Sequence, residues 1–184
     1  MATGSSGSSI SQMLSQSRDV LLHPSVATFE KYEKLGTVRD AIVYVAIASA
    51  ISGVFGLTEG IGGFLRNLIA SILGFLVFTY LVHWLGSRRG GTGTLDEVAY
   101  SFALFWAPLS VLISVVTLLL VLTLIGVFLL PLVALAGLAL NVYYAYLATQ
   151  ASLNLQSGGG TWVVLLMAAI GSFLVSLIVG AILG

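Results

Sequence analysis

Long runs of apolar residues dominate the chain and predict membrane-spanning helices. The runs cover about residues 40–57, 63–85, 95–122, 127–151 and 161–183. A helix rising 1.5 Å per residue needs about 20 residues to cross a hydrocarbon core of ~30 Å. The runs are continuous rather than alternating, which excludes the ten-residue strands of a membrane barrel. The predicted fold class is therefore all-α, a polytopic membrane helical bundle with five transmembrane helices.

The boundaries between these runs come from helix-capping and turn residues. Thr94 and Glu97 form the capping-box pattern at the start of the third run. No charged residue follows Glu97, so the remaining chain is too long for one span and must fold back at least twice. We place one turn at residues 124–126, shortly before Pro131, and the other at the glycine-rich stretch 156–160.

The first 40 residues are different in character. Residues 1–20 are rich in Ser and Gly and lack a basic segment leading into an apolar one, so we interpret them as a flexible tail rather than a signal peptide. Residues 21–184 then form the predicted membrane domain. It begins with a short amphipathic helix on the membrane surface, in which apolar residues recur near helical spacing between charged ones.

This amphipathic helix has two interpretations, which the sequence leaves open. It either caps the bundle or forms a docking surface for a cytoplasmic protein partner. The candidate docking residues are Pro24, Phe29, Tyr32, Lys31 and Lys34.

Composition supports a membrane location and argues against nucleic-acid binding and metal or cofactor sites. The 184 residues are 58% hydrophobic and 8% charged, whereas a soluble domain carries about 25% charged residues. The net charge of zero does not favour nucleic-acid binding. The chain has no cysteine, and its two histidines are about 60 residues apart, so we expect no disulfide, no metal site and no cofactor.

The distribution of Lys and Arg predicts the orientation in the membrane. Four cations lie before the first predicted span, and Arg88 and Arg89 lie in the second loop. Both regions fall on one side if the spans alternate, and cations accumulate on the cytoplasmic side. We therefore expect a cytoplasmic N-terminus and an external C-terminus.

Few residues inside the spans are able to carry chemistry. The candidates for a polar groove along the fourth helix are Arg66, Asn67, Tyr100, Asn141 and Tyr144. Amides and phenols inside a bundle usually hydrogen-bond between helices, so a structural role is the first interpretation and a solute or lipid-headgroup groove the alternative. Nucleophile-elbow and zinc-protease motifs are missing, and we predict no catalytic residue and no enzymatic activity.

Small residues repeat every four positions in the fifth predicted helix. The stripe consists of Ala168, Ser172, Ser176 and Gly180. Such stripes let helix backbones approach closely. Packing within the bundle and self-association into a homo-oligomer are both consistent with the pattern.

The order of these features resembles the Yip domain family, the Ypt/Rab-interacting membrane proteins. The element from Leu21 to Phe29 resembles the family's leucine–proline–Thr-Phe entry before the first of five helices. The segment from Gly90 to Glu97 resembles its second loop, and Ala107-Pro108 its frequent proline in the third helix. The aromatic residues from Asn141 to Tyr146 occupy the place of its fourth helix.

The resemblance implies a non-enzymatic role. Eukaryotic members act in ER–Golgi vesicle traffic, bind prenylated Rab GTPases and associate with one another. This chain lacks their long cytoplasmic N-terminal region, and its compact size is similar to that of the prokaryotic members. We therefore expect a membrane-organising interaction scaffold of a prokaryotic cytoplasmic membrane, with a transporter, channel or lipid scramblase as the alternative.

The orientation gives a direct test. A cytoplasm-specific reporter inserted between Arg88 and Arg89 is expected to be active, whereas the same reporter fused after Gly184 is expected to be inactive. An external-side reporter should show the opposite pattern. Equal activity at both sites would contradict an odd number of spans between Arg89 and Gly184.

Overall fold

The computed structural model describes residues 9–54, 60–123, 126–155 and 158–183, with side chains described as far as residue 178. The described residues form α-helices and one short 3₁₀-helix, with no strand among them. In chain order they are α1 Ile10–Leu22, α2 Val26–Tyr32, α3 Val38–Val54, α4 Gly60–Ser87, α5 Leu95–Val121, η2 Gly126–Leu129, α6 Leu130–Leu153 and α7 Gly158–Leu183. The prediction of an all-helical fold is therefore confirmed.

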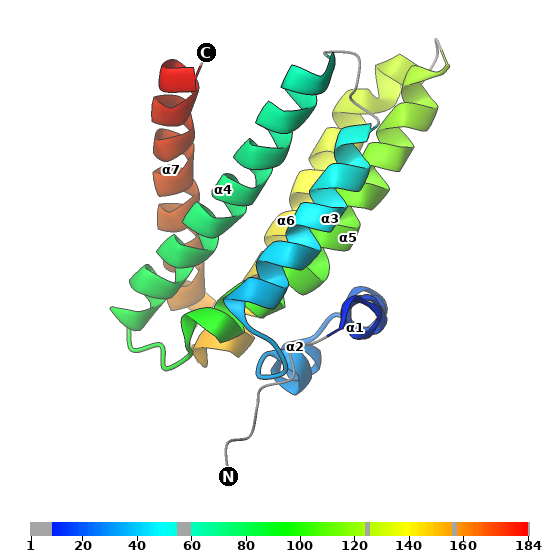
Figure 1. The fold of residues 1–184 in the computed structure, drawn as a ribbon. Helices are drawn as coiled ribbons and strands as arrows, with labels where there is room; N and C mark the ends of the chain where they lie inside the picture. Colours follow the sequence, from blue (N-terminus) through cyan, green and yellow to red (C-terminus); the bar gives the residue numbers. More distant parts are fainter. Residues whose placement is uncertain (1–8, 55–59, 124–125, 156–157, 184) are drawn as a thin grey trace.

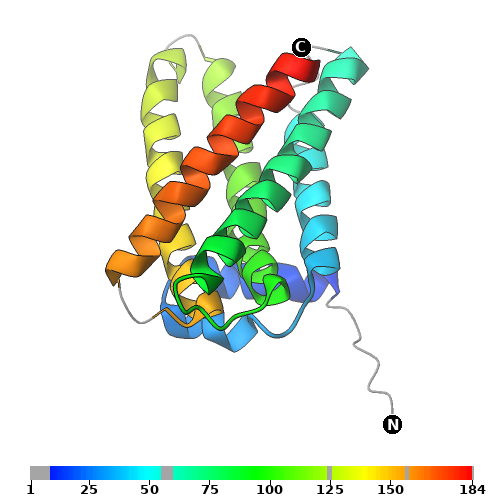
Figure 2. The same cartoon turned by 90° about the vertical axis from the view of Figure 1, so that its left-hand side faces the viewer.

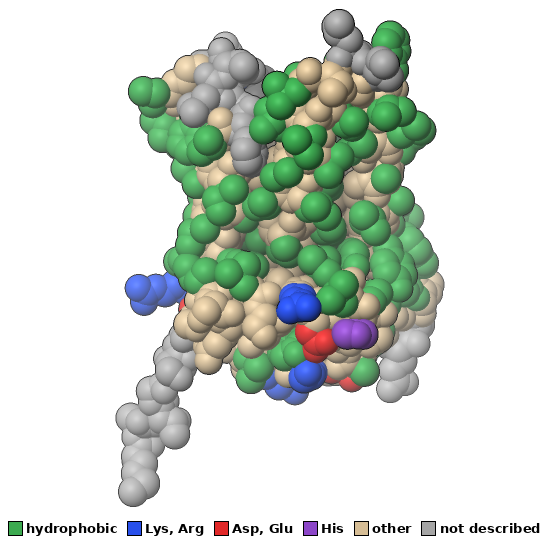
Figure 3. All heavy atoms as spheres, turned by 90° about the vertical axis from the view of Figure 1, so that its right-hand side faces the viewer, with side chains coloured by type: hydrophobic (Ala, Val, Ile, Leu, Met, Phe, Trp, Pro, Cys, Tyr) green, Lys and Arg blue, Asp and Glu red, His purple; other side chains and the backbone are tan. Residues whose placement is uncertain are grey.

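Four of these segments are long and apolar enough to cross a membrane: 60–87, 95–121, 126–153 and 158–178. They turn much of their apolar surface outward, as a multi-pass membrane protein does, because lipid is its solvent. Figure 3 shows apolar side chains over most of one face, with Lys, Arg, Asp, Glu and His gathered near its lower end. The molecule is therefore a multi-pass helical bundle with one charged end.

The helices run alternately up and down. α3 rises from the charged end, α4 returns to it, α5 rises, α6 returns, and α7 ends at the opposite end (Figure 1). α1 and α2 lie beneath the bundle, crossing its axis (Figure 2). We call the end formed by α1, α2 and the connections 33–37 and 88–94 the base, and the opposite end the far end.

Helix boundaries agree closely with the predicted runs. The second, third and fifth predicted helices match α4, α5 and α7 to within three residues at each described end. The capping box of Thr94 and Glu97 is present at the start of α5. α3 corresponds to the first predicted helix, and the last three residues of that prediction, 55–57, lie outside the described residues. The shorter α3 is not among the four candidate spans.

The start of the fourth predicted helix needs a correction. Residues 126–129 form the 3₁₀-helix η2, and the α-helix begins only at Leu130. Pro131 explains the boundary, because proline lacks a backbone N–H and is accepted in the first turn of an α-helix but not further inside. Residues 124–125 of the predicted turn lie outside the described residues.

The N-terminal region needs a larger correction. Residues 10–22 form α1, so the prediction of a flexible tail as far as residue 20 is wrong for this part, while residues 1–8 lie outside the described residues. Ser9 and Gln12 form a capping box, in which each side chain accepts the other residue's backbone N–H. The serine-rich composition concealed this local signal. The predicted surface helix is shorter than expected and corresponds to α2.

The tightly packed core lies toward the base. α5 is buried almost continuously from Val98 to Leu109, whereas its residues beyond Leu109 are half-buried or exposed. α3 and α6 pack against α5, and α7 packs against α4. Toward the far end, the ribbon of α7 stands apart from those of α3, α5 and α6 (Figure 1). The base is therefore the part that holds the bundle together.

The connection between α4 and α5 is held against the end of α6. The Thr92 backbone N–H donates to the Leu153 carbonyl at 3.1 Å, and the Asn154 side chain donates to the Thr92 hydroxyl at 3.1 Å. Asn154 has a φ of 54°, a left-handed conformation that ends α6. Gly93 is buried against the same turn, where a Cβ would overlap the backbone carbonyl oxygen of Ser152.

This close approach predicts the effect of adding a methyl group. Gly93→Ala should reduce the free energy of unfolding by about 1–3 kcal/mol, as overpacking does, because backbone atoms cannot rotate away. A Cβ at Gly62 in α4 meets nothing within 4 Å. Gly62→Ala should therefore be neutral or stabilising by up to about 1 kcal/mol. SDS titration followed by circular dichroism measures both, and equal stabilities would contradict the close approach.

Candidate functional site

Three long-range hydrogen bonds attach α1 to the spans. The Tyr100 hydroxyl donates to the Gln16 side-chain oxygen at 2.6 Å, and the Tyr144 hydroxyl donates to the Leu21 carbonyl at 2.9 Å. The Ser17 and Tyr44 hydroxyls lie 3.0 Å apart in a buried contact. A hydrogen bond within a protein contributes a net of about 0.5–1.5 kcal/mol to the free energy of unfolding. α1 is thereby fixed to α3, α5 and α6.

α2 is held by aromatic packing. Phe29 is completely buried, and its ring meets the Phe105 ring edge-on with centroids 6.2 Å apart. Phe105 also stacks on Tyr144 at 5.7 Å and contacts Phe102 at 5.4 Å. The side of α2 that the sequence suggested as a docking surface is thus partly turned into the bundle.

Asp19 joins α1 to α2. Its carboxylate accepts hydrogen bonds from the Tyr32 hydroxyl at 2.6 Å and from the Lys31 ammonium at 3.1 Å, and it lies 3.0 Å from the His23 ring. The hydrogen bond from Tyr32, followed by those from Lys31 and His23, lowers the pKa of Asp19 to about 2. Asp19 therefore stays ionised and fixes the angle between the two helices.

The other acids at the base are used mainly inside the molecule. Asp96 accepts the Val38 backbone N–H at 2.7 Å, which connects the start of α3 to α5. Asp40 accepts the Thr37 N–H at 2.9 Å, and Glu97 accepts the Thr94 N–H at 2.7 Å. Acceptors at helix N-termini are favourable because the first N–H groups lack helical partners. These carboxylates organise the backbone.

The cations at the base point outward. The side chains of Arg18, Lys31, Lys34, Arg39, Arg88 and Arg89 are all exposed, whereas four of the acids, Asp19, Glu33, Asp40 and Glu97, are buried or half-buried. Within the described residues, Arg66 is the charged residue that lies outside 18–40 and 88–97. Arg88 lies over the Trp84 ring at 4.1 Å. The accessible surface of the base is thus basic, although the chain is neutral overall.

Glu33 differs from the other charged residues of the base because its side chain is almost completely buried. Its residue is 3% exposed, one carboxylate oxygen lies 3.8 Å from the Lys34 ammonium, and the other has no hydrogen-bond partner among the described residues. Burial raises its pKa to about 7, with a further contribution from the Glu97 and Glu30 carboxylates, and Lys34 offsets this only in part.

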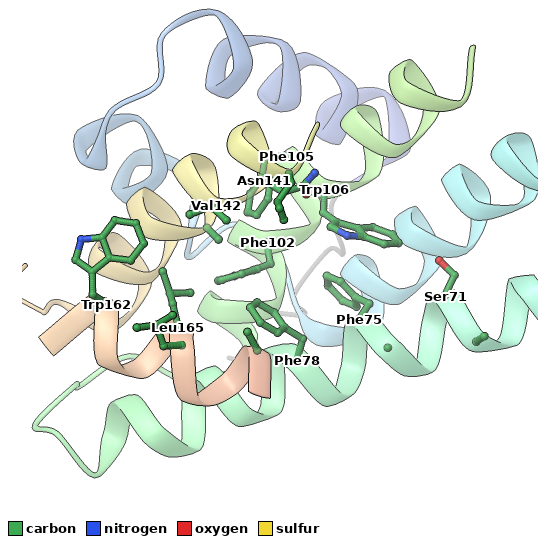
Figure 4. Close-up of a pocket in the computed structure, with 16 residues that line it drawn as sticks. Ser71, Phe75, Phe78, Phe102, Phe105, Trp106, Asn141, Val142, Trp162 and Leu165 are labelled. Atoms are coloured by element: carbon green, nitrogen blue, oxygen red, sulfur yellow. The ribbon is translucent and has the colours of Figure 1, made fainter. Parts of the chain in front are cut away.

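A cavity of about 460 Å³ lies among α4, α5, α6 and α7. Figure 4 shows Phe75, Phe78 and Phe102 on one side, with Trp162 and Leu165 of α7 across from them. Apart from the indole N–H groups of Trp106 and Trp162, the polar side chains in its wall are Ser71 and Asn141. Asn141 donates to the Gly137 carbonyl at 2.8 Å, and the Ser71 hydroxyl lies 2.8 Å from that of Ser49. The cavity is therefore apolar and aromatic.

A family comparison agrees with this architecture. The model of the Yip1 domain matches residues 18–178, which include all four candidate spans, α2 and α3. The chain belongs to the Yip1 domain family. No curated protein and no solved structure matches it. The Yip1 match begins inside α1, so the helix that the sequence analysis missed lies partly within the family domain.

In this Yip1-domain chain, the five predicted groove residues do not come together. Tyr100 and Tyr144 turn their hydroxyls to α1, and Asn141 lines the cavity. Arg66 and Asn67 are exposed near the start of α4, toward the far end. The polar groups of α5 and α6 thus serve interhelical hydrogen bonding, and the predicted groove along the fourth helix is replaced by an apolar cavity.

The predicted docking residues divide into two groups. Phe29 and Tyr32 hold α2 in place, and Pro24 is half-buried. Lys31 and Lys34 are exposed on the outer side. Sequence reasoning missed Gln16 and Ser17, the partners of two tyrosine hydroxyls, because they lie in the segment interpreted as tail. The Ser9–Gln12 capping box was the signal that would have revealed the helix.

The small-residue stripe of α7 serves packing at its start. Ala168 is completely buried, Ser172 is half-buried, and Ser176 is exposed, while the side-chain description ends before Gly180. A Cβ at Gly171 would lie 2.9 Å from a methyl carbon of Leu81 in α4. Small residues therefore let α7 approach α4 closely.

Buried Glu33 predicts a pH-dependent stability. Because its folded-state pKa is raised from 4.5 to about 7, ionisation of Glu33 destabilises the fold. The stability contributed by its proton is complete below pH ~4.5 and is lost as pH rises through about 7. Glu33→Gln should flatten this dependence and melt at a higher temperature than the parent at pH 8. Glu30→Gln, which changes an exposed carboxylate one turn earlier, is the matched control.

Thermal melts in detergent between pH 4.5 and pH 8.5 give the required comparison. If Glu33→Gln and Glu30→Gln show the same pH profile as the parent chain, the buried Glu33 carboxylate is not the titrating group.

Proposed function

We propose that this chain is a non-enzymatic scaffold of a prokaryotic cytoplasmic membrane, which self-associates and binds cytoplasmic proteins through its base. The observation that carries the proposal is the basic, rigid surface made by α1 and α2. Four of the six described acids at the base are buried or half-buried, whereas its six cations are exposed, so the surface favours acidic partners. Such an arrangement suits recognition better than catalysis.

The proposal includes α3 as a fifth span. Its residues run from the base beside Arg39 toward the far end, where α4 begins, so the chain has to cross between them. The described 17 residues give a length of about 25 Å at 1.5 Å per residue, close to a hydrocarbon core of ~30 Å. Five alternating spans then put the base and the end of α7 on opposite sides.

The orientation follows from the exposed cations. Lys and Arg accumulate on cytoplasmic loops, and six of the seven exposed cations lie at the base, whereas Arg66 lies toward the far end. We therefore assign the base and the N-terminus to the cytoplasm and the C-terminus to the outside. The base also faces the anionic headgroups of that leaflet, which attract exposed Lys and Arg.

The alternative, a transporter, channel or scramblase, gains less support. A solute path needs polar groups that continue through the membrane. Of the five residues proposed for such a path, Asn141 alone lines the cavity, and its amide is already bonded to Gly137. The non-enzymatic part of the proposal rests on the missing catalytic motifs in the sequence.

Site-specific photo-crosslinking tests the scaffold proposal in living cells. A photoreactive residue replaces Lys34 on the base or, as the matched control, Leu119, an exposed position toward the far end of α5. We expect protein adducts at position 34, including a second copy of the chain, at several-fold higher yield than at position 119. Arg18→Gln should weaken them by removing an exposed cation. Lipid-only adducts at both positions, with a monomer in nanodiscs, would refute the scaffold.

A further inference from the structure

The cavity among α4, α5, α6 and α7 has no use in the scaffold proposal. Its walls are hydrocarbon and aromatic surface, including Phe75, Phe102, Phe105 and Trp106. Its volume of about 460 Å³ falls in the range of about 300–1,000 Å³ that holds small-molecule ligands. A space of this size inside a packed bundle forfeits the van der Waals contacts of its lining. An occupant would restore them.

The chemistry of the wall excludes water and polar solutes as good occupants. A cavity water needs about two to four polar partners. The Ser71 hydroxyl and the Asn141 amide each already have a hydrogen-bond partner in the protein. The indole N–H groups of Trp106 and Trp162 add donors but no acceptor. No Asp, Glu, Lys, Arg or His side chain belongs to the lining. The complementary ligand is therefore an uncharged hydrocarbon.

The position of the cavity determines where such a hydrocarbon comes from. Its lining on α7 runs from Trp162 to Ala169, about 6–16 Å along the helix from Gly158 at the base. On α7 and α5 the lining lies in the half nearer the base, and on α4 it extends to Ala70, just past the middle of that helix. Leu138, Trp162 and Leu166 line the cavity and are 62%, 44% and 59% exposed, so the opening between α6 and α7 joins the lipid-facing surface.

We infer that this cavity is a lateral binding site for one acyl chain of a phospholipid from the leaflet next to the base. The chain enters between α6 and α7 and lies against the aromatic wall, while its headgroup stays in the interface near the exposed cations. No hydrogen bond in the bundle has to break. Entry from the membrane also needs no desolvation, because the site exchanges one hydrocarbon environment for another.

Contact quenching of tryptophan tests whether the chain is there. Trp106 lines the cavity and contacts Phe75 with ring centroids 5.8 Å apart. Trp84→Phe with Trp162→Phe leaves Trp106 as the single tryptophan. In vesicles of phosphatidylcholine brominated near the middle of its chains, we expect strong quenching of Trp106. Aqueous iodide should leave it unquenched.

Two glycines of α4 supply a matched pair of variants. A Cβ meets nothing within 4 Å at either Gly74 or Gly62, both are exposed, and Gly74 alone of the two lines the cavity. Gly74→Phe should fill the site and reduce bromine quenching of Trp106 several-fold. Gly62→Phe should leave the quenching unchanged. Equal quenching in both variants, quenching by iodide, or no quenching by brominated lipid would overturn the site.

Native mass spectrometry supplies a second measurement that keeps all three tryptophans. Purified into mild detergent, the parent chain and Gly62→Phe should retain one phospholipid, and Gly74→Phe should lose it. Retention by all three proteins, by none, or retention of an isoprenoid or a lipid-anchored protein in place of a phospholipid would contradict the proposal. The crosslinking result at Lys34 is independent of either outcome.

Discussion

Hydrocarbon offers no hydrogen-bond partner, and this constraint shapes every part of the molecule. Backbone groups in the spans must be satisfied within helices, so irregular backbone is confined to the connections at the two ends. The same rule governs side chains. The hydroxyls of Tyr44, Tyr100 and Tyr144 reach α1, and Ser49, Ser71 and Asn141 hydrogen-bond to each other or to a nearby carbonyl. Among the described residues, the buried hydroxyls of Ser52, Ser101, Thr149 and Ser172 are exceptions without a partner. The base supplies the polar partners that the lipid cannot.

The base therefore both holds the helices together and exposes cationic side chains. Asp19, Asp40, Asp96 and Glu97 accept hydrogen bonds that hold α1, α2 and the helix starts in place. The arginines and lysines of the base remain exposed on its surface. A neutral chain thus acquires a basic face without any excess of positive charge. Because the packed core lies directly above, the position of this face is tied to the packing of the spans. The aromatic cavity lies beside this core, among α4, α5, α6 and α7.

Some features of this structure could be predicted from the sequence and others could not. α4, α5 and α7 were predicted closely because hydropathy, capping residues and glycine-rich breaks are local signals. The 3₁₀ start at Gly126 was missed, although Pro131 pointed to an altered first turn. α1 was missed because a serine-rich composition outweighed one capping box. The five residues predicted to line a polar groove do not come together, because sequence alone does not show which helix faces meet.

The sequence by itself determined that the chain lies in a membrane, where four of its spans run and at which end its charges gather. These properties follow from composition and from patterns a few residues long. Only the tertiary structure decided that Tyr100 meets Gln16 and Tyr144 meets Leu21, pairs separated by 84 and 123 positions. It also decided that α7 leaves an aromatic cavity open to lipid. The physical reason is that all faces of an apolar helix are nearly equivalent in hydrocarbon. Which helices pair therefore depends on shape complementarity and on hydrogen bonds between them.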